Sequence, residues 1–290
     1  MPPRFDLQSH STHSDGALAA AEVVRRAAQA GVQLLALSDH DTVSGVSEAL
    51  AAGERAGVRV VPAVEISSID SGAATPRELH ILGYLIDHTD PSFASLLADF
   101  LTDRERRTLR MAAALEELGF ELDKAQLDAR VAAGKPIGRP HLAEAVLGAP
   151  ANASRLREES IDDIGSLIRG YLIEGRPAFR LRETPAVAQA IDAIHEASGV
   201  AVWAHPFWDI SNPGEVLSSI DRFHALGLDG VEAFYITHTR ENTQMLADRC
   251  AELGLLTTGS ADFHGPDNRQ FSKFMAFETY GIEPNLGPIA

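Results

Sequence analysis

The sequence predicts an α/β fold of barrel-like form with a helical insertion domain. Three observations support this prediction. Short apolar runs alternate with helical patterns in the first hundred residues and again after about residue 177. The stretch between them has helical patterns and almost no strand signal. The chain also lacks G-x-G-x-x-G after its first strand and G-x-x-x-x-G-K-[ST] anywhere, which disfavours a dinucleotide-binding sheet.

Four strands and two helices are expected in the N-terminal part of the chain. Helical patterns cover 17–31 and 43–56, and runs of strand length lie at 4–9, 32–38, 58–67 and 78–86. Continuous apolar runs between helices are typical of parallel strands that are covered on both faces.

The insertion domain is expected over residues 96–177. A long helix is predicted over 93–120, and shorter helices follow over 121–131, 139–148 and 160–173. The barrel is therefore expected to be discontinuous in sequence, formed by residues 1–95 and 178–290.

The alternation of strands and helices returns in the C-terminal part of the chain. Helices are predicted over 184–199, 213–227 and 239–254, and strands over 200–206, 228–236 and 255–265. The tail 271–282 is predicted to add a last strand. With about seven strands, nearly all followed by a helix, the pattern favours a barrel-like arrangement.

The composition disfavours several classes of protein. A formal net charge of −16 argues against a stable complex with long nucleic acid, which requires a basic surface. A small anionic substrate stays compatible, because a few local cations can bind it. No apolar run is long enough for a membrane helix, no secretory signal is visible, and the single cysteine, Cys250, allows no intramolecular disulfide. We expect a cytoplasmic protein without a membrane partner, and no oligomeric state is predicted.

Polar side chains follow the predicted strands where each strand ends. In a closed barrel of parallel strands, active sites lie at the carboxyl ends of the strands. Two of the candidate pairs, Gln8/His10 and Asp262/His264, have the i, i+2 spacing that points both side chains the same way. The candidates from six strands are Gln8, His10, Asp15, Asp39, His40, Asp41, Glu65, Glu78, His80, His205, Asp262 and His264.

Imidazole and carboxylate groups are the ligands that Zn²⁺, Mn²⁺ and Fe²⁺ prefer. The candidate residues outnumber the ligands that one ion needs, so we expect two or three divalent ions. Bound cations would also relieve the repulsion between so many carboxylates. Each residue alone has an ordinary alternative: Asp15 and Asp41 could cap helices, and Glu65 could pair with an arginine. Their joint placement at strand ends favours the metal site.

At these residues the chain resembles the PHP (polymerase and histidinol phosphatase) family of metal-dependent phosphoesterases. The family's opening motif D-L-H-x-H-(S/T)…S-D-G stands here as DLQSHSTHSDG, and its (S/T)-D-H-(D/N) motif as SDHDT. A strand-end glutamate in VPAVEIS, a histidine in ELHILGY, WAHP and a final SADFHG follow in order. The resemblance implies a distorted (β/α)7 barrel. The insertion with GRPHLAEAV resembles the subgroup that includes nucleoside 3′,5′-bisphosphate phosphatases and short-RNA exonucleases.

The resemblance also implies up to three ion sites. They would be formed by Gln8, His10, Glu65 and Asp262, by Asp15, His40 and His264, and by Glu65, His80 and His205, with Glu65 bridging. The family has histidine where this chain has Gln8. A neutral amide is a poorer ligand, so either the first ion is weakly held or absent, or Gln8 binds through its oxygen.

Substrate binding and proton transfer require further groups. The predicted substrate-binding residues are Arg104, Arg107, Arg139, His141 and His238. Arg104 and Arg107 share a helix face, which could equally be a solvated surface. Arg139 and His141 begin a predicted helix, whose N-terminus would favour phosphate. His205, His238 and Asp39 are the candidates for protonating the leaving group, and the sequence does not rank them.

The function expected from this set is phosphoric ester hydrolysis by metal-activated water. The resemblance makes a nucleoside 3′,5′-bisphosphate the leading substrate. A cyclic sugar phosphate and 5′-phosphorylated short RNA are alternatives within the same chemistry. A catalytically impaired protein that binds metal or anions, or a metal-dependent amidohydrolase, is the alternative of a different class.

Overall fold

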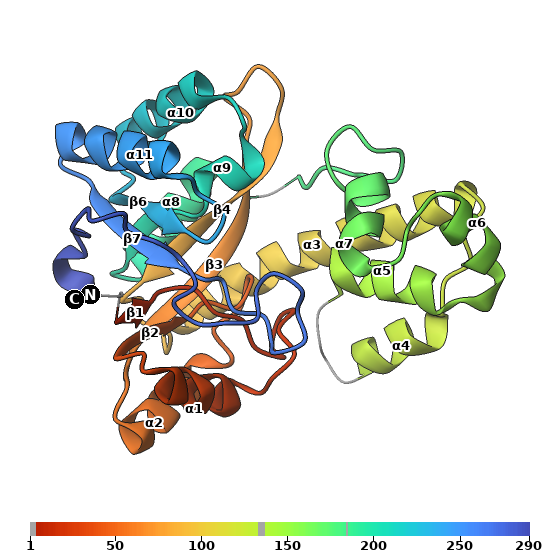
Figure 1. Ribbon diagram of the computed structural model, residues 1–290, viewed down its shortest axis with the longest axis horizontal. Coiled ribbons are helices and arrows are strands. Elements are labelled where there is room, and N and C mark those ends of the chain that lie inside the picture. The colour runs from red at the N-terminus through yellow and green to blue at the C-terminus, as the bar shows by residue number, and fades with distance from the viewer. Residues whose placement is uncertain (1–3, 133–136, 184) are drawn as a thin grey trace. The chain divides into compact units, whose positions relative to one another are not determined.

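The computed structural model describes residues 4–132, 137–183 and 185–290, and these form two compact units (Figure 1). The first unit comprises Met1–Ala98 and Pro185–Ala290, and the second comprises Asp99–Thr184. Residue 184, the expected first residue of one helix, lies outside the described part of the chain.

The first unit is built on a seven-stranded sheet in which strands that are consecutive in the chain are neighbours. The strands are β1 Phe5–Asp6, β2 Leu34–Leu37, β3 Arg59–Asp70, β4 Arg77–Tyr84, β5 Val200–Trp203, β6 Gly230–Tyr235 and β7 Leu256–Ser260. The first and last strands meet, because the Leu7 amide donates to the Gly259 carbonyl at 3.1 Å and Ser9 forms a parallel bridge with Phe263. The sheet is therefore a nearly closed barrel, which confirms the predicted distorted (β/α)7 fold.

The direction of β4 differs from the expectation that the barrel strands are parallel. β4 is antiparallel to both β3 and β5, whereas the other neighbouring pairs are parallel. The connection between β3 and β4 spans only residues 71–76, which is too short for the crossover that parallel strands require. His80 therefore lies in the middle of its strand, not at the expected C-terminal end. Because the strand is reversed, its N-terminal half faces the same barrel mouth as the C-terminal half of β3.

Helices cover the outside of the barrel. They are α1 Ala20–Ala30, α2 Val46–Ala56, α8 Val187–Glu196, α9 Pro206–Asp209, α10 Pro213–Ala225 and α11 Arg240–Leu253. Figure 1 shows α1 beside α2, and α10 beside α11. In α1 the buried residues Ala20, Val23, Val24 and Ala27 follow helical spacing and pack in one cluster with β2. Burial of each valine side chain stabilises the fold by roughly 1.5–3 kcal/mol.

The second unit is helical, as its sequence pattern predicts. Its apolar core gathers Met111, Leu115, Phe120, Leu142 and Val146. The helices are α3 Pro91–Glu117, which begins in the first unit, α4 Lys124–Ala132, α5 Arg139–Gly148, α6 Ala153–Glu158 and α7 Ile164–Leu167, with a 3₁₀ turn η1 at Pro150–Asn152 and a π turn η2 at Ile168–Leu172.

The tail does not form the last strand that was expected over 271–282. Residues 271–290 are irregular apart from the 3₁₀ turn η3, Gly287–Ile289. The tail is held by single hydrogen bonds, such as that from the Met275 amide to Asp6 at 2.7 Å. β7 already lies beside β1, so the barrel offers the tail no free edge to extend. Among the described residues, no helix has the length and apolar character needed to cross a bilayer.

Candidate metal centre

Glu65 is the residue around which the predicted donors gather. Its side chain is 1% exposed and lies in the middle of β3. Its Oε1 lies 2.6 Å from His80 Nδ1 and 3.2 Å from His205 Nε2. Its Oε2 lies 3.1 Å from His10 Nε2 and 3.6 Å from His40 Nδ1. One carboxylate thus faces histidines from four different segments of the chain.

Four carboxylate–histidine contacts extend the cluster away from Glu65. Asp262 Oδ1 lies 3.0 Å from His10 Nε2. Asp15 Oδ1 lies 3.7 Å from His10 Nδ1 and 3.6 Å from His264 Nε2, and Asp15 Oδ2 lies 3.7 Å from His40 Nε2. All eight predicted His, Asp and Glu donors therefore meet at one end of the barrel.

The donor atoms fall into three groups in which all ligand atoms lie within 4.8 Å of one another. The groups are His10, Asp15 and His264; His10, His40 and Glu65; and Glu65, His80 and His205. The third group has the composition that the resemblance implies for the bridged site. The first two groups differ from the sites that the resemblance implies. The resemblance assigns His10 to one ion and Asp15, His40 and His264 to another, whereas here His10 lies in both groups.

Several of these buried donor atoms lie within 3.7 Å of an oppositely charged group but without the geometry of a hydrogen bond. They are both ring nitrogens of His10, Nδ1 of His80, Nδ1 of His205 and Oδ1 of Asp262. A buried polar atom without a partner costs free energy, and such atoms are rare in folded proteins. Lone pairs of imidazole and carboxylate that converge in this way suit divalent transition-metal ions, so the residues present fit such ions.

Protonation balances the charges of the cluster in the metal-free chain. Burial lowers the pKa of His10 and His205, but the carboxylates that face their rings outweigh it and raise both pKa values well above the usual value. Burial raises the pKa of Glu65, but the charges of His40 and His80 and further histidine hydrogen bonds hold it well below its usual value. The pKa of Asp262 is also lowered, against burial, chiefly by the charge of His264.

Unusual backbone conformations accompany the cluster. Asp41, His205 and Asp262 have positive φ values of 54°, 33° and 54°. Such conformations cost roughly 1–3 kcal/mol each for a residue with a side chain and tend to occur at functional sites. The first loop, residues 7–19 between β1 and α1, folds back so closely that a Cβ on Gly16 would be 2.2 Å from the His10 carbonyl oxygen. This close approach explains why the loop has glycine at that position.

Asp39 holds the first loop in place. It accepts hydrogen bonds from the Ser11 amide at 2.8 Å, the Ser11 hydroxyl at 2.6 Å and the Ser14 hydroxyl at 2.5 Å. It is 2% exposed. These bonds favour a structural role for Asp39 over the catalytic role considered from the sequence.

Gln8 turns its amide nitrogen, not its oxygen, toward the cluster. Its Nε2 donates to Glu65 Oε2 at 2.9 Å, and its Oε1 accepts from the Ser260 hydroxyl at 3.2 Å. A donor therefore occupies one lone pair of the shared carboxylate. This arrangement favours the expectation that the ion nearest Gln8 is weakly held.

Two residues that the sequence reasoning missed support the donors from behind. Glu232 Oε2 accepts from the His205 amide at 2.9 Å, and the Tyr235 hydroxyl donates to Asp262 Oδ2 at 2.8 Å. Both are buried in β6. An acidic side chain inside the apolar run GVEAFY was the available signal, because a charge there needs a buried partner.

The buried Glu232 predicts a pH-dependent difference in stability. Burial raises its pKa from 4.5 to about 8. Below pH 4.5 the carboxyl is neutral in both the folded and the unfolded state, and its contribution to stability is complete. As the pH rises from 4.5 through 8, ionisation favours the unfolded state and this contribution is lost. Glu232→Gln keeps the shape and stays neutral. Between pH 5 and pH 9, we expect the metal-free variant to gain about 3 kcal/mol in free energy of unfolding relative to the wild type.

Urea unfolding of both proteins in chelator, at several pH values, measures this difference. Titrations common to both proteins cancel in the comparison. Parallel stability curves for the two proteins would show that Glu232 ionises normally in the folded state.

His238 is a neutral acceptor, not a cation. Its Nδ1 lies 3.1 Å from the Ala233 carbonyl and must donate to it, which leaves Nε2 as a buried acceptor without a hydrogen bond. Burial lowers the pKa of His238 to about 4. At neutral pH this environment disfavours His238 both as a proton donor and as an ionic phosphate ligand.

The other predicted substrate-binding residues lie in the helical unit. Arg104 and Arg107 are 8% and 2% exposed, so they do not form the solvated helix face that the sequence left open. Arg139 is half-buried in the first turn of α5, where His141 Nδ1 accepts from the Gly138 amide at 3.0 Å. Buried guanidinium groups are a common means of binding phosphate.

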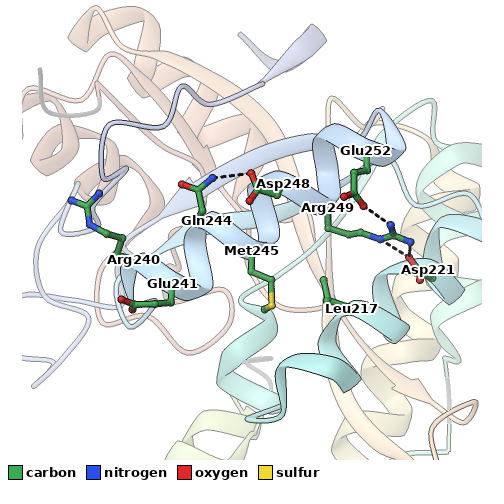
Figure 2. Close-up of a pocket in the computed structure, with 9 residues that line it drawn as sticks. All are labelled: Leu217, Asp221, Arg240, Glu241, Gln244, Met245, Asp248, Arg249 and Glu252. Carbon is green, nitrogen blue, oxygen red and sulfur yellow. Dashed lines mark hydrogen bonds and ion pairs between the residues drawn. The ribbon is translucent and has the colours of Figure 1, made fainter.

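A surface hollow lies apart from the donor cluster. It has a volume of about 800 Å³ and lies between α10 and α11 (Figure 2). Arg249 Nε donates to Asp221 at 2.8 Å on its wall. None of the predicted metal or substrate residues lines this hollow, so its position does not suggest the active site.

Comparison with known proteins agrees with this geometry. The PHP domain family matches residues 6–122. A 5′-3′ exoribonuclease of Haemophilus influenzae is 34% identical, with 92% of each chain covered. A phosphoribosyl 1,2-cyclic phosphate 1,2-diphosphodiesterase of Eggerthella lenta is 34% identical, with 91% of this chain and 95% of that protein covered. A 3′,5′-nucleoside bisphosphate phosphatase of Chromobacterium violaceum is 32% identical, with 90% and 87% covered.

Two solved structures share the fold over nearly the whole chain. An amidohydrolase from Chromobacterium violaceum, solved with bound sulfate and no metal, superimposes with a TM-score of 0.81 at 28% identity and covers 99% of this chain and 93% of its own. A metal-dependent phosphoesterase from Bifidobacterium adolescentis has a TM-score of 0.75 at 27% identity, with 93% and 91% covered.

Proposed function

Because the chain belongs to the PHP family and is a phosphoric ester hydrolase, we propose that it releases phosphate from a nucleoside 3′,5′-bisphosphate. The convergence of His10, His40, His80 and His205 on the single buried carboxylate of Glu65 is the observation that carries this proposal. Such a cluster suits two or three divalent ions, for which Mn²⁺, Fe²⁺ and Zn²⁺ are the candidates.

The ligand sets proposed for these ions follow the clustered donors. Glu65 is shared, with His80 and His205 on one side and His10 and Asp262 on the other, and Asp15, His40 and His264 complete the set. When bound, divalent ions supply a water of lowered pKa and neutralise charge on the phosphoryl oxygens. The chain's own residues fix the donors: Tyr235 orients Asp262, and Glu232 holds the backbone of His205.

Phosphate binding is proposed for the arginines of the helical unit. Arg104, Arg107 and Arg139 provide guanidinium groups whose planar donors match phosphate oxygens. The bound sulfate in the related amidohydrolase structure supports the proposal that a protein of this fold binds a tetrahedral anion. We retain none of the three candidates for the proton donor, because Asp39 holds a loop, His238 is a neutral acceptor and His205 is proposed as a metal ligand.

Two other substrates are candidates, and each is supported by a relative of this chain. Hydrolysis of 5′-phosphorylated short RNA is supported by the exoribonuclease, and a cyclic sugar phosphate by the diphosphodiesterase, both at 34% identity. Assays with Mn²⁺ should compare release of phosphate from adenosine 3′,5′-bisphosphate and from ribose 1,2-cyclic phosphate 5-phosphate with release of nucleoside monophosphate from a 5′-phosphorylated RNA trimer. We expect the bisphosphate to have the highest kcat/KM. Full metal occupancy with no turnover of any phosphoester would instead support an anion-binding or amide-hydrolysing protein.

Gln8→His is expected to strengthen binding of the weakest ion. The substitution replaces the amide donor on Glu65 Oε2 with an imidazole that can offer a lone pair. We expect its Mn²⁺ dissociation constant to fall by roughly 10–100-fold, the range associated with changes close to a metal. Calorimetric titration measures this constant, and Gln33→His, which adds a histidine at an exposed position, is the control. Equal affinity and stoichiometry in wild type and Gln8→His would refute a weakening role for Gln8.

A further inference from the structure

An exposed tryptophan lies next to the donor cluster. Trp208 is 51% exposed and follows the donor His205 by three residues in the short helix α9. The other exposed large apolar side chains of the described residues are Leu109, Val131 and Leu226, and none of these is aromatic. A single exposed apolar side chain is ordinary, so the surroundings of Trp208 carry the argument.

Trp208 belongs to a continuous set of aromatic rings. Its ring lies 5.6 Å from Phe271 at 62° and 6.4 Å from Tyr235 at 76°. Phe271 in turn lies 5.5 Å from the ring of His264, and Tyr235 lies 5.2 Å from the ring of His205. We call Trp208, Phe271 and Tyr235 the aromatic rim. The rim contacts donors on both sides of the cluster.

Backbone hydrogen bonds hold two members of the aromatic rim, Trp208 and Phe271, in place. His205 adopts a left-handed conformation that turns the chain into α9, and the Trp208 amide donates to the His205 carbonyl at 2.8 Å. The His264 amide donates to the Phe271 carbonyl at 2.9 Å, and the Phe271 amide is bound by the Asn268 side chain at 2.9 Å. Trp208 and Phe271 are therefore attached through backbone bonds to segments that carry donors.

From this geometry we propose that Trp208 and Phe271 stack the base of a nucleotide whose phosphate lies at the donor cluster. The inference rests on the proposed phosphatase function and extends it by assigning the recognition of the base. Every nucleobase has a π face that stacks on aromatic side chains irrespective of its sequence identity. A cyclic sugar phosphate has no such group, so the rim favours a substrate that carries a base over one that does not.

Paired substrates test the proposal. Wild type, Trp208→Ala and Trp208→Phe should be assayed with adenosine 3′,5′-bisphosphate and with the matching 1-O-methylribose 3,5-bisphosphate, which lacks the base. We expect Trp208→Ala to raise KM for the adenosine substrate by roughly 5–100-fold, with kcat changed far less. Trp208→Phe should restore most of the affinity, and the substrate without a base should respond to neither variant. Equal effects of Trp208→Ala on both substrates, or no effect on either, would overturn the assignment.

A binding measurement separates the stacking proposal from the phosphatase proposal. Trp203, the other tryptophan, is fully buried, so Trp208 is the tryptophan accessible to a ligand. Titration with AMP should quench wild-type tryptophan fluorescence, and ribose 5-phosphate should not. The same titration of Trp208→Phe should show little quenching. Quenching without phosphate release would support stacking and refute the phosphatase, whereas phosphate release without base-dependent quenching would refute stacking.

Discussion

Replacing Glu65 with alanine should lower kcat/KM for phosphate release by about a thousandfold or more, because it removes the carboxylate that His10, His80 and His205 share. Two of the three donor groups contain Glu65, so we expect the variant to retain at most one ion. Metal content by plasma mass spectrometry, with phosphate release measured in the same samples, checks both expectations.

Controls distinguish this loss from unfolding. Glu54→Ala changes an exposed glutamate of α2 and should leave activity and metal content unchanged. Glu65→Gln keeps the volume of the side chain but removes its charge, and it should also lose metal. A Glu65→Ala protein with a native circular dichroism spectrum, full metal content and activity within tenfold of the wild type would contradict the shared-ligand role.

Removing the metal should abolish activity while leaving the barrel folded. In the metal-free chain, protons on His10 and His205 balance the buried carboxylates, as their raised pKa values indicate. The apolar core cluster of the barrel consists of side chains that are not metal donors. Chelation followed by gel filtration should therefore give a protein with a native far-UV spectrum, and added Mn²⁺ should restore its activity.

The protons on His10 and His205 also predict how metal binding to the metal-free protein depends on pH. A metal ion binds neutral imidazole, so it must displace the protons that His10 and His205 hold below their raised pKa values. Affinity should therefore rise with pH, by about tenfold per unit for each proton displaced. Titration of the metal-free protein with Mn²⁺ in weak buffer should release protons. Reloading that is independent of pH and releases no protons would show that the histidines are not displaced by metal.

Most elements of the fold could be predicted because their signals are local. Apolar runs precede His10, Glu65 and His205, although β3 continues past Glu65 to Asp70 instead of ending there as expected. Helix α1 ends at Gly31, whose φ of 88° suits glycine. The direction of β4 depends on a six-residue connection, and its shortness would have indicated a hairpin. The tail was misjudged because only the closed barrel shows that no edge is left for it.

The donor set could be predicted because each donor lies within or close to a strand, in a recognisable motif. Their supporting residues could not be predicted in the same way. Glu232 meets His205 across 27 residues, and Tyr235 meets Asp262 across another 27, so neither pairing follows from local sequence. The orientation of the Gln8 amide depends on Glu65 and Ser260, which are 57 and 252 residues away. Such contacts are fixed by the closure of the barrel.

Anomalous diffraction from crystals soaked in Mn²⁺ tests the central claim most directly. We expect at least two peaks at this barrel mouth, one of them within ligand distance of Glu65 together with His80 and His205. Crystals of Glu65→Ala should lose that peak. Manganese bound elsewhere on the protein, or no bound manganese at a concentration that supports phosphate release, would contradict the proposed centre.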